Sequence, residues 1–312
     1  MCIRWLQGWR SPVLDLAMRG LSALGNESFF LLLFPFLYWC LDPRLGLRVS
    51  VVCFLSGWLN HALKQALAQP RPMDLAAGIN LVEQSGYGLP SGHAQGAVVL
   101  WGLLALLAVR RGAAARPGGA GRWVWAPAAL LSLSIGLSRV YLGVHFPTDI
   151  LAGWALGAVV LAAAAWVLGR LPAWPALPER LRRSGSLPWW AGIPIAALPA
   201  GAALALVPEK DSVAMVAGML GFLTGHLLRR GLWNLGEEGS LLQRLLRLPV
   251  GLAVLAGLYL GLKRLFPVYL PLRFVRYLLA GGWVSLGAPL LFRWIGLARL
   301  RAPDGLPGNR PK

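Results

Sequence analysis

Residues 124–170 read VWAPAALLSLSIGLSRVYLGVHFPTDILAGWALGAVVLAAAAWVLGR. Two apolar runs, 124–144 and 148–170, are each near the roughly 20 residues that a membrane-spanning helix needs, and a short turn joins them. The polar residues that stand out at this turn include Ser138, Arg139, His145 and Asp149. Ionisable groups in so apolar a setting are costly and usually functional. The stretch predicts two membrane helices with a functional site at the turn between them.

The whole chain has the composition of an integral membrane protein. Its mean hydropathy is +0.60, and 57% of its 312 residues are hydrophobic while 13% are charged, against about a quarter charged in soluble domains. The apolar stretches of spanning length are 25–41, 46–68, 93–110, 124–144, 148–170, 189–207, 212–228, 249–266 and 276–297. The expected fold class is all-α, a polytopic transmembrane helical bundle of about nine spans.

Interruptions of the apolar pattern suggest the domain organisation. Residues 12–24 contain Asp15 and Arg19 and are expected to lie at the membrane interface, whereas a stretch rich in Arg and Pro separates two halves of the chain. The expected segments are an N-terminal interfacial segment (1–24), a membrane core that carries the polar motifs (25–170), a cytoplasmic linker (171–188), additional transmembrane helices (189–297) and a cytoplasmic tail (298–312).

The formal net charge of +18 reflects membrane topology rather than a nucleic-acid surface. The basic residues form no single patch or run. If the N-terminus lies outside and the nine spans alternate, most of the 30 Lys and Arg residues fall on one side, which the positive-inside rule makes cytoplasmic. The motif-bearing loops then face outward. High usage of Ala, Gly, Leu and Arg is typical of a GC-rich bacterium, so we expect a bacterial plasma membrane with the site facing the periplasm.

Three motifs carry the chemistry. The first is Lys64 followed by Arg71-Pro72, the second is Pro90-Ser91-Gly92-His93, and the third is Ser138-Arg139 with His145 and Asp149. All lie at helix ends: Pro70 and Pro72 end the second span, and Ser91 is a candidate N-cap for the third. Because the loops after spans two and four lie on the same side of the membrane, topology allows the motifs to meet.

These residue types suit phosphoryl transfer. Positive charge must hold the phosphate oxygens, and Lys64, Arg71 and Arg139 are candidates for this role. Ser91 and the Gly92 N–H are expected to complete the phosphate site. Asp149 follows His145 by four residues, so it can bond the imidazole and fix its tautomer, which makes His145 the candidate nucleophile. His93 has no carboxylate near it in sequence and is left as the general acid.

The three patterns Lys-x6-Arg-Pro, Pro-Ser-Gly-His and Ser-Arg-x5-His-x3-Asp resemble the signature motifs of the type 2 phosphatidic acid phosphatase superfamily. The resemblance covers residues 25–170. It implies a phosphohistidine intermediate on His145, acid catalysis by His93, and neither metal nor other cofactor. Vanadium-dependent haloperoxidases share this superfamily but are soluble, and the hydropathy argues against them. The C-terminal half is similar in placement to the longer sphingosine phosphate and glucose phosphatase branches, although no motif there supports kinship.

The expected function is an integral membrane lipid phosphatase. The candidate substrates are phosphatidate, phosphatidylglycerol phosphate, polyprenyl diphosphate and sphingoid phosphates. A lipid phosphotransferase that passes the group from the same phosphohistidine to a second lipid is an alternative. A lipid-phosphate transporter is another, although it has no evident use for the orienting carboxylate Asp149. The expected partners are the lipid phosphate substrate and membrane lipids, with no nucleic acid.

Several residues outside the assigned catalytic and phosphate-binding groups also have expected roles. His61 and His226 are expected to pack rather than to react, Asp74 and Glu83 to be solvated loop residues, and Tyr87 is a candidate for the entrance of the site. Small-xxx-small spacing, which lets helices approach closely, occurs at Gly153/Gly157, Gly221/Gly225 and Gly257/Gly261. These faces allow a homodimer.

Overall fold

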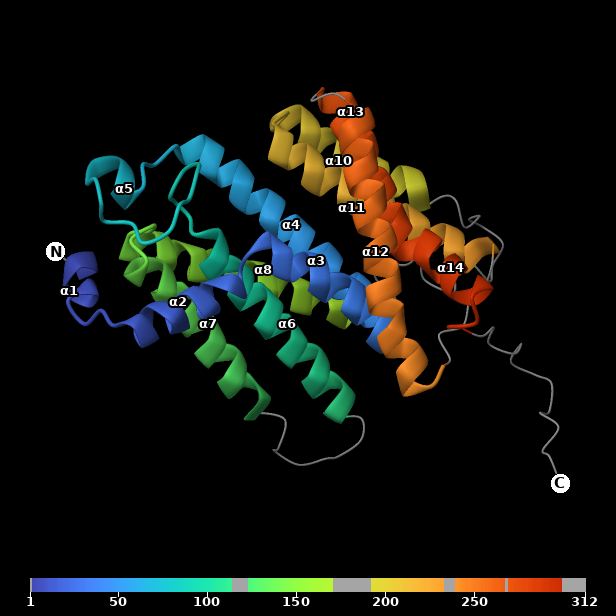
Figure 1. The fold of residues 1–312 in the computed structure, drawn as a ribbon, viewed down its shortest axis with the longest axis horizontal. Coiled ribbons are helices and arrows are strands. Elements are labelled where there is room, and N and C mark those ends of the chain that lie inside the picture. The colour runs from blue at the N-terminus through green and yellow to red at the C-terminus, as the bar shows by residue number, and fades with distance from the viewer. Residues whose placement is uncertain (1, 114–122, 171–191, 233–238, 267–268, 299–312) are drawn as a thin grey trace.

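The computed structural model describes residues 2–113, 123–170, 192–232, 239–266 and 269–298, and all regular secondary structure in these residues is helical (Figure 1). The N-terminal half comprises α1 (Cys2–Gln7), α2 (Pro12–Ala23), α3 (Glu27–Pro35), the π-helical η1 (Phe36–Leu41), α4 (Pro43–Leu67), α5 (Pro72–Leu75), α6 (Gly92–Ala113), α7 (Trp125–Tyr141) and α8 (Pro147–Arg170). The C-terminal half comprises α10 (Gly192–Leu206), α11 (Lys210–Leu232), α12 (Leu241–Leu265), α13 (Leu270–Gly282), the π-helical η4 (Trp283–Gly287) and α14 (Ala288–Trp294). The predicted linker 171–188 and the tail from residue 299 onward lie outside the described residues.

The all-α fold class is confirmed, and each of the nine predicted apolar stretches falls on a helix or on consecutive helices. In the described residues, five helices are long and apolar enough to cross a membrane, and a sixth span results if α2 and α3–η1, bent by 53°, count as one. The helix α4 is not among these five, and its sequence contains polar residues such as Ser56, Asn60 and Gln65. Nine spans stay a prediction.

The helix α12 begins earlier than the sequence pattern predicted. It starts at Leu241 rather than at residue 249, because Ser240 and Gln243 form a reciprocal capping box at its N-terminus. Because Arg247 is charged, the predicted apolar stretch began only after it, at residue 249. In the structure Arg247 is buried, and it donates hydrogen bonds to the carbonyl oxygens of Trp39 (3.0 Å) and Leu297 (2.8 and 3.0 Å).

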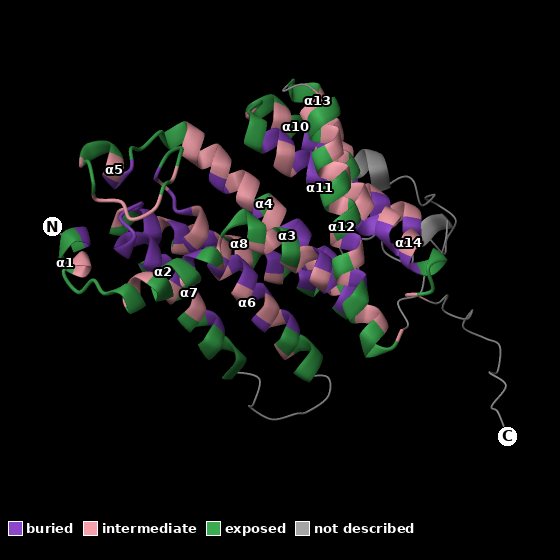
Figure 2. Ribbon diagram, viewed as in Figure 1, coloured by how far each residue is buried: buried purple, intermediate pink, exposed green. Residues whose placement is uncertain are grey.

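Close helix packing in the N-terminal half depends on two glycines. A Cβ at Gly153 would lie 2.6 Å from the Ser91 carbonyl oxygen, and one at Gly157 would lie 2.9 Å from that of Gln95. The helix α8 can therefore approach the backbone of α6 only with glycine at these positions. Buried residues gather where α4, α6 and α8 meet (Figure 2). They include Val49, Val52, Leu100, Leu103 and Leu168.

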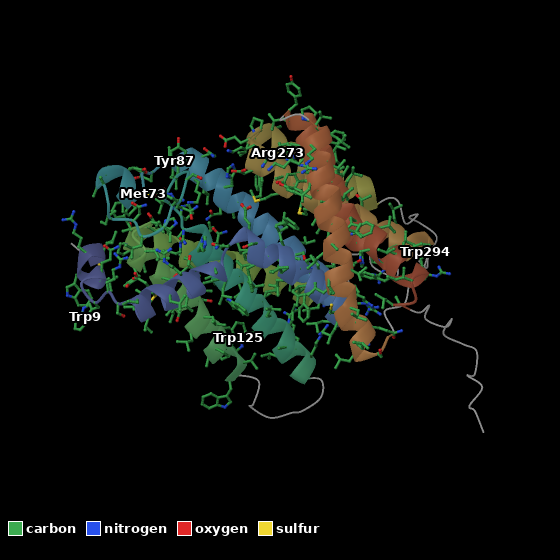
Figure 3. All side chains as sticks on the ribbon, in the orientation of Figure 1. Trp9, Met73, Tyr87, Trp125, Arg273 and Trp294 are labelled. Atoms are coloured by element: carbon green, nitrogen blue, oxygen red, sulfur yellow. The ribbon has the colours of Figure 1, made fainter. Side chains whose placement is uncertain are left out.

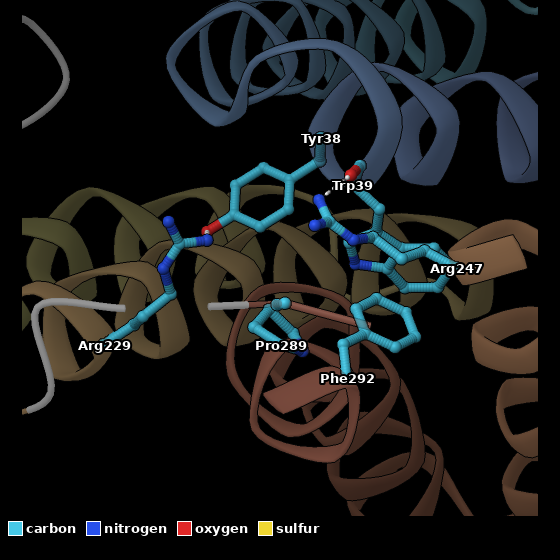
Figure 4. A pocket seen from close by; sticks show the side chains of 7 residues that line it. Tyr38, Trp39, Arg229, Arg247, Pro289 and Phe292 are labelled. Atoms are coloured by element: carbon cyan, nitrogen blue, oxygen red, sulfur yellow. Dashed lines mark hydrogen bonds between the residues drawn. The ribbon is translucent and has the colours of Figure 1, made fainter. Parts of the chain in front are cut away.

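The two halves share one apolar core. Tyr38 and Trp39 of η1 pack against Phe222 of α11 and Phe292 of α14. Tyr38 Oη lies 2.8 Å from His226 Nδ1, and Trp39 Nε1 donates to the Val284 carbonyl at 2.7 Å. Beside them is a small cavity lined by Tyr38, Trp39, Arg229, Arg247, Pro289, Phe292 and Ala298 (Figure 4). No residue of the three motifs lines this cavity, and His226 packs as predicted.

The glycine pairs divide into two kinds. Gly221 and Gly225 let α11 pack tightly against α13 and η4, since a Cβ at Gly221 would lie on the Leu278 carbonyl. Gly153 and Gly157 are likewise used within the chain. A Cβ on Gly257 or Gly261 of α12 would meet no other described residue within 4 Å. Dimerisation stays a prediction.

Candidate active site

The three motifs lie at the ends of different helices, as the sequence predicts. Lys64 is in the last turn of α4 and Arg71 caps α5. The second motif opens α6, with Ser91 Oγ accepting from the Ala94 N–H at 3.4 Å in the N-cap position. Arg139 ends α7, and Asp149 is in the first turn of α8. Met73 and Tyr87 mark the segments that connect α4 to α6 at this end of the bundle (Figure 3).

His145 is held between a carboxylate and a guanidinium. It is 2% exposed; its Nδ1 lies 3.1 Å from Asp149 Oδ2, and its Nε2 lies 3.1 Å from Arg71 Nη1. An arginine can only donate and an ionised carboxylate can only accept. The two contacts together assign the proton to Nδ1 and leave the lone pair on Nε2. That is the tautomer of a nucleophilic imidazole.

The His145 imidazole is also kept uncharged. It lies in the loop between α7 and α8, where burial lowers the pKa of His145 well below the ordinary histidine value of 6.5. The positive charges of Arg71, Lys64 and Arg139 lower this pKa further. All three predicted phosphate-binding cations therefore act on the same imidazole.

Arg71 organises the loop that precedes the second motif. Its Nε and Nη2 donate to the carbonyls of Gly86 (2.6 Å) and Ser85 (3.1 Å), and its Nη1 also donates to the Val144 carbonyl (2.9 Å). Asp74 is exposed, as predicted, and it also accepts from the Arg71 N–H at 2.7 Å and caps the short helix α5. The guanidinium thereby joins the first and third motifs.

Lys64 reaches the same loop from α4. Its Nζ donates to the carbonyl oxygens of Tyr87 (2.5 Å) and Gly88 (2.8 Å). Backbone carbonyls carry no net charge, so the positive charges of Lys64 and Arg71 are solvated there without being neutralised. A Cβ at Gly88 would lie 3.1 Å from Asp149 Oδ2, which places this loop directly against the carboxylate. Tyr87 contributes a carbonyl to the site, and its side chain is 39% exposed.

Arg139 is buried and incompletely partnered. One Nη donates to Ser22 Oγ of α2, and the other to Gln84 Oε1 at 2.7 Å. Its Nε, also buried, has no hydrogen-bond partner in the described part of the chain. An unsatisfied charged donor of this kind is costly, and an anion at the site would satisfy it. Ser22 and Gln84 were not predicted from the sequence.

His93 faces the N-terminal segment. Its Nε2 lies 2.9 Å from Asn26 Oδ1, at the turn between α2 and α3. A Cβ at Gly25 would come within 2.5 Å of the His93 ring. The residues close enough to act electrostatically on His93 are Arg139, His145, Arg71 and Lys64. The segment 12–24, predicted to be interfacial, therefore also packs along α7 and helps to shape the site.

A buried polar network supports the second motif. Asn60 Nδ2 donates to the Pro90 carbonyl at 3.2 Å and to Gln95 Oε1 at 2.7 Å. Gln95 in turn donates to the Ser56 carbonyl at 2.9 Å and its Oγ at 2.8 Å. Asn60 and Gln95 are amides inside predicted spans, which was a signal that could have identified them.

Ser91 and Gly92 differ in whether their backbone N–H groups already have a hydrogen-bond partner. Ser91 is fully buried, and its N–H donates to the Asp149 carbonyl at 2.9 Å, so this N–H is already used. Gly92 begins α6, where the first N–H groups have no partner within the helix. His61, one turn before Lys64, lies 3.4 Å from Glu209 Oε2 and serves the packing of α4 against the C-terminal half, as predicted.

Comparisons with known proteins match both halves. A sequence model of the PAP2 superfamily matches residues 45–172, and one described as a PAP2 superfamily phosphatase transmembrane extension matches residues 213–300. The second match relates the C-terminal helices, in which no motif was found, to the same superfamily.

The names of individual relatives describe phosphatases of lipid phosphates. Phosphatidylglycerophosphatase B of Bacillus subtilis (strain 168) is 33% identical over 152 residues, which cover 47% of this chain and 72% of the relative. Sphingosine-1-phosphate phosphatase 1 of Rattus norvegicus is 30% identical over 147 residues, 45% of this chain but only 32% of that longer relative. The solved PAP2-type phosphatidylglycerolphosphate phosphatase from Bacillus subtilis is 28% identical, covers 54% of this chain and 83% of its own, and has a TM-score of 0.47.

Motifs that converge at one end of a membrane helix bundle agree with these sequence matches. The chain belongs to the PAP2 superfamily.

Proposed function

We propose that this protein is a lipid phosphatase that hydrolyses a phosphomonoester or diphosphate of a lipid through a phosphohistidine on His145. The observation that carries the proposal is the placement of His145 Nε2 against Arg71, with Asp149 on the opposite ring nitrogen. The names of two relatives, a phosphatidylglycerophosphatase and a sphingosine-1-phosphate phosphatase, support a lipid phosphomonoester as substrate.

In the first step the Nε2 lone pair of His145 attacks phosphorus, and the bond from phosphorus to the lipid oxygen breaks. His93 gives its proton to that oxygen as it leaves. Asp149 accepts the Nδ1–H bond and stabilises the positive charge that develops on the phosphorylated ring. Phospho-His145 and the dephosphorylated lipid are the products of this step.

In the second step water attacks the phosphorus of phospho-His145. His93, now neutral, takes a proton from that water, and the bond from nitrogen to phosphorus breaks. Inorganic phosphate leaves and His145 regains its lone pair. The proton on His93 is available for the next turnover, so the cycle balances and needs no metal.

The cations supply electrostatic stabilisation. Lys64, Arg71 and Arg139 would face the equatorial oxygens of the transferring group, and the unpartnered Nε of Arg139 is a donor ready for one of them. The Gly92 N–H at the start of α6 would add a backbone donor, with the Ser91 hydroxyl beside it. In the described residues the carboxylates of Asp149 and Asp74 both act on Arg71, so three cations face two carboxylates and the site stays net positive, which suits a phosphate dianion.

Phosphotransfer to a second lipid remains the nearest alternative, because it uses the same intermediate. Labelled phosphate found on a second lipid rather than in solution would favour transfer. A transporter would bind the lipid phosphate without a covalent step, so trapping of a phosphoenzyme would exclude it.

The orientation proposal follows the basic residues: residues 25–170 would form the catalytic core of a bacterial plasma-membrane protein whose site faces the periplasm. Tyr87 and Arg111 are exposed at opposite ends of this core. An impermeant thiol reagent applied to intact cells should label a Tyr87→Cys protein and leave an Arg111→Cys protein unlabelled. The reverse pattern would refute the orientation.

The activity proposal is tested by phosphate release from phosphatidate, phosphatidylglycerol phosphate, polyprenyl diphosphate and a sphingoid phosphate, each with EDTA present. We expect at least one substrate to be hydrolysed at an undiminished rate in EDTA and the His145→Ala protein to release none above background. Full activity of His145→Ala, or loss of activity on chelation that added metal restores, would contradict the proposal.

A further inference from the structure

A second cationic site lies in the C-terminal half. Arg276 is in α13, within a segment that meets the criteria for a membrane span, and is only 8% exposed. Its Nε is buried without a hydrogen-bond partner. In residues 239–266 and 269–298, as in the other described parts of the chain, no hydrogen bond or ion pair involves its guanidinium. A buried, unpaired cation in a membrane protein marks a functional site and calls for a counter-ion.

Two tyrosine rings hold this guanidinium. Its central carbon lies 5.3 Å from the ring centre of Tyr259 on α12 and 5.4 Å from that of Tyr277 on α13. The two rings meet edge to face at 5.9 Å, and their hydroxyl oxygens are 3.3 Å apart. Ring faces stabilise a cation without accepting its N–H bonds. The five N–H donors of Arg276 therefore remain available to a planar or tetrahedral oxyanion.

A second arginine adds to the positive charge. Arg273 lies 5.4 Å from the Tyr277 ring, donates to the Lys210 carbonyl at 2.8 Å, and is 3.5 Å from Asp211 Oδ1. The Asp211 carboxylate is 53% exposed and forms an ion pair with Arg273. It does not offset Arg276, so the cluster keeps a net positive charge that comes from the buried guanidinium.

The cluster is at the same end of the bundle as the candidate active site. Lys210, which Arg273 contacts, follows Glu209, and Glu209 accepts from Gln65 Nε2 at 2.6 Å beside Lys64. Figure 3 shows Tyr87 and Arg273 toward the same side of the molecule. With a rise of about 1.5 Å per residue, Arg276 is about 9 Å below the start of α13. With α13 taken to enter the membrane at its first residue, this depth is close to the boundary between the headgroup layer, roughly 5–8 Å thick, and the acyl chains.

We propose that Arg276, with the rings of Tyr259 and Tyr277, binds the phosphate group of an anionic phospholipid in the leaflet that the active site faces. Arg273 reinforces the attraction from the surface side. A lipid is the occupant that this depth favours, because its phosphate lies at the level of the guanidinium while its acyl chains lie along the apolar surfaces of α12 and α13. The inference does not depend on the catalytic mechanism.

The test is binding of a fluorescent phosphatidylglycerol to purified protein in detergent, followed by anisotropy. Phosphatidylglycerol has a phosphodiester, so the proposed hydrolysis of monoesters would not consume it. We expect Arg276→Gln to weaken binding about tenfold or more, as removal of a buried charge-assisted contact does, and Arg276→Lys to weaken it less. The matched control is Arg264→Gln, which removes an exposed charge near the same end of α12 and should bind like the unaltered protein.

Three competitors identify the occupant. Unlabelled phosphatidylglycerol should displace the probe at lower concentration than phosphatidylcholine, whose choline cation the two arginines repel, and millimolar inorganic phosphate should not displace it. Equal displacement by inorganic phosphate would overturn the lipid assignment. Equal probe affinity in Arg276→Gln and Arg264→Gln would overturn the site itself and leave Arg276 as a packing residue. If Arg276→Gln fails to fold, Arg276→Lys decides: affinity equal to that of Arg264→Gln would overturn the role of the guanidinium fork.

Discussion

At the scale of single residues, the most informative contact is the one between His145 and Asp149. The two hydrogen-bond partners of His145 fix the imidazole tautomer, because Asp149 accepts from Nδ1 and Arg71 donates to Nε2. The sequence spacing predicted the Asp149 contact. It could not predict the Arg71 contact, because the two residues are on different loops and meet only when α4 and α7 pack in the same bundle.

The Asp149→Asn protein tests this tautomer. An amide can donate to Nδ1, which would move the proton to Nε2 and remove the lone pair. We expect kcat to fall by about 100-fold or more, with KM nearly unchanged because Asp149 does not face the phosphate. Thr148→Ala, an exposed neighbour in the same turn, is the control and should leave kcat unchanged. A rise in KM at constant kcat would show that Asp149 acts in binding instead.

The pH dependence follows from the electrostatics of His145. Attack needs the neutral imidazole, and the pKa of His145 lies well below 6.5 because the ring is buried among cations. As pH falls through 6.5 the nucleophile therefore stays neutral, and kcat/KM should not decline on its account until a lower pH is reached. A profile of kcat/KM from about pH 4.5 to 8 measures this. An acidic limb centred at 6.5 or above would contradict it.

At the scale of elements, the site depends on how closely α8 approaches α6. Gly153 allows this approach, and the Ser91 carbonyl that it faces belongs to the second motif. The N-terminal helix α2 adds Ser22 to the same region, and Asn26 follows at its end. Sequence reasoning missed this contribution because charges in α2 suggested a surface position, whereas Asp15 and Arg19 bond to Tyr141 and the Leu81 carbonyl of the site-side segments.

Gly153→Ala should damage both stability and activity. The added Cβ would meet backbone rather than a flexible side chain, and overpacking of this kind costs about 1–3 kcal/mol. Gly257→Ala is the same substitution where a Cβ meets no other described residue within 4 Å, so it should be neutral or stabilise by up to about 1 kcal/mol through helix propensity. Thermal unfolding in detergent and phosphate release measure the two effects. Equal behaviour of the two proteins would contradict the packing argument.

At the scale of the whole molecule, apolar stretches predicted where helices lie, and motif positions predicted which helix ends meet. Both follow from local chemistry: length, proline, and a capping serine. The starts of α12 and α13 were missed because Arg247 and Arg273 looked incompatible with membrane helices. In the structure both guanidinium groups bind carbonyl oxygens, and Arg276, which the predicted span included, lies between tyrosine rings. Such compensation arises from tertiary packing and leaves no periodic signal.

The sequence pattern also could not predict how the two halves of the chain pack against each other. Tyr38, Trp39 and His226 are ordinary residues of apolar stretches, yet their side chains connect η1 to α11 and η4. The C-terminal helices therefore form one core with the catalytic half, which agrees with the match of each half to the PAP2 superfamily.

Trapping the covalent intermediate tests the phosphohistidine on His145 most directly. In a His93→Ala protein, p-nitrophenyl phosphate has a leaving group that needs no acid, so phosphorylation should proceed while hydrolysis of the intermediate stalls. Rapid quenching at alkaline pH, which preserves phosphohistidine, and peptide mass spectrometry should find one phosphate on His145, and none in a protein that also carries His145→Ala. Phosphate on another residue, or turnover with no phosphorylated peptide, would contradict the central claim.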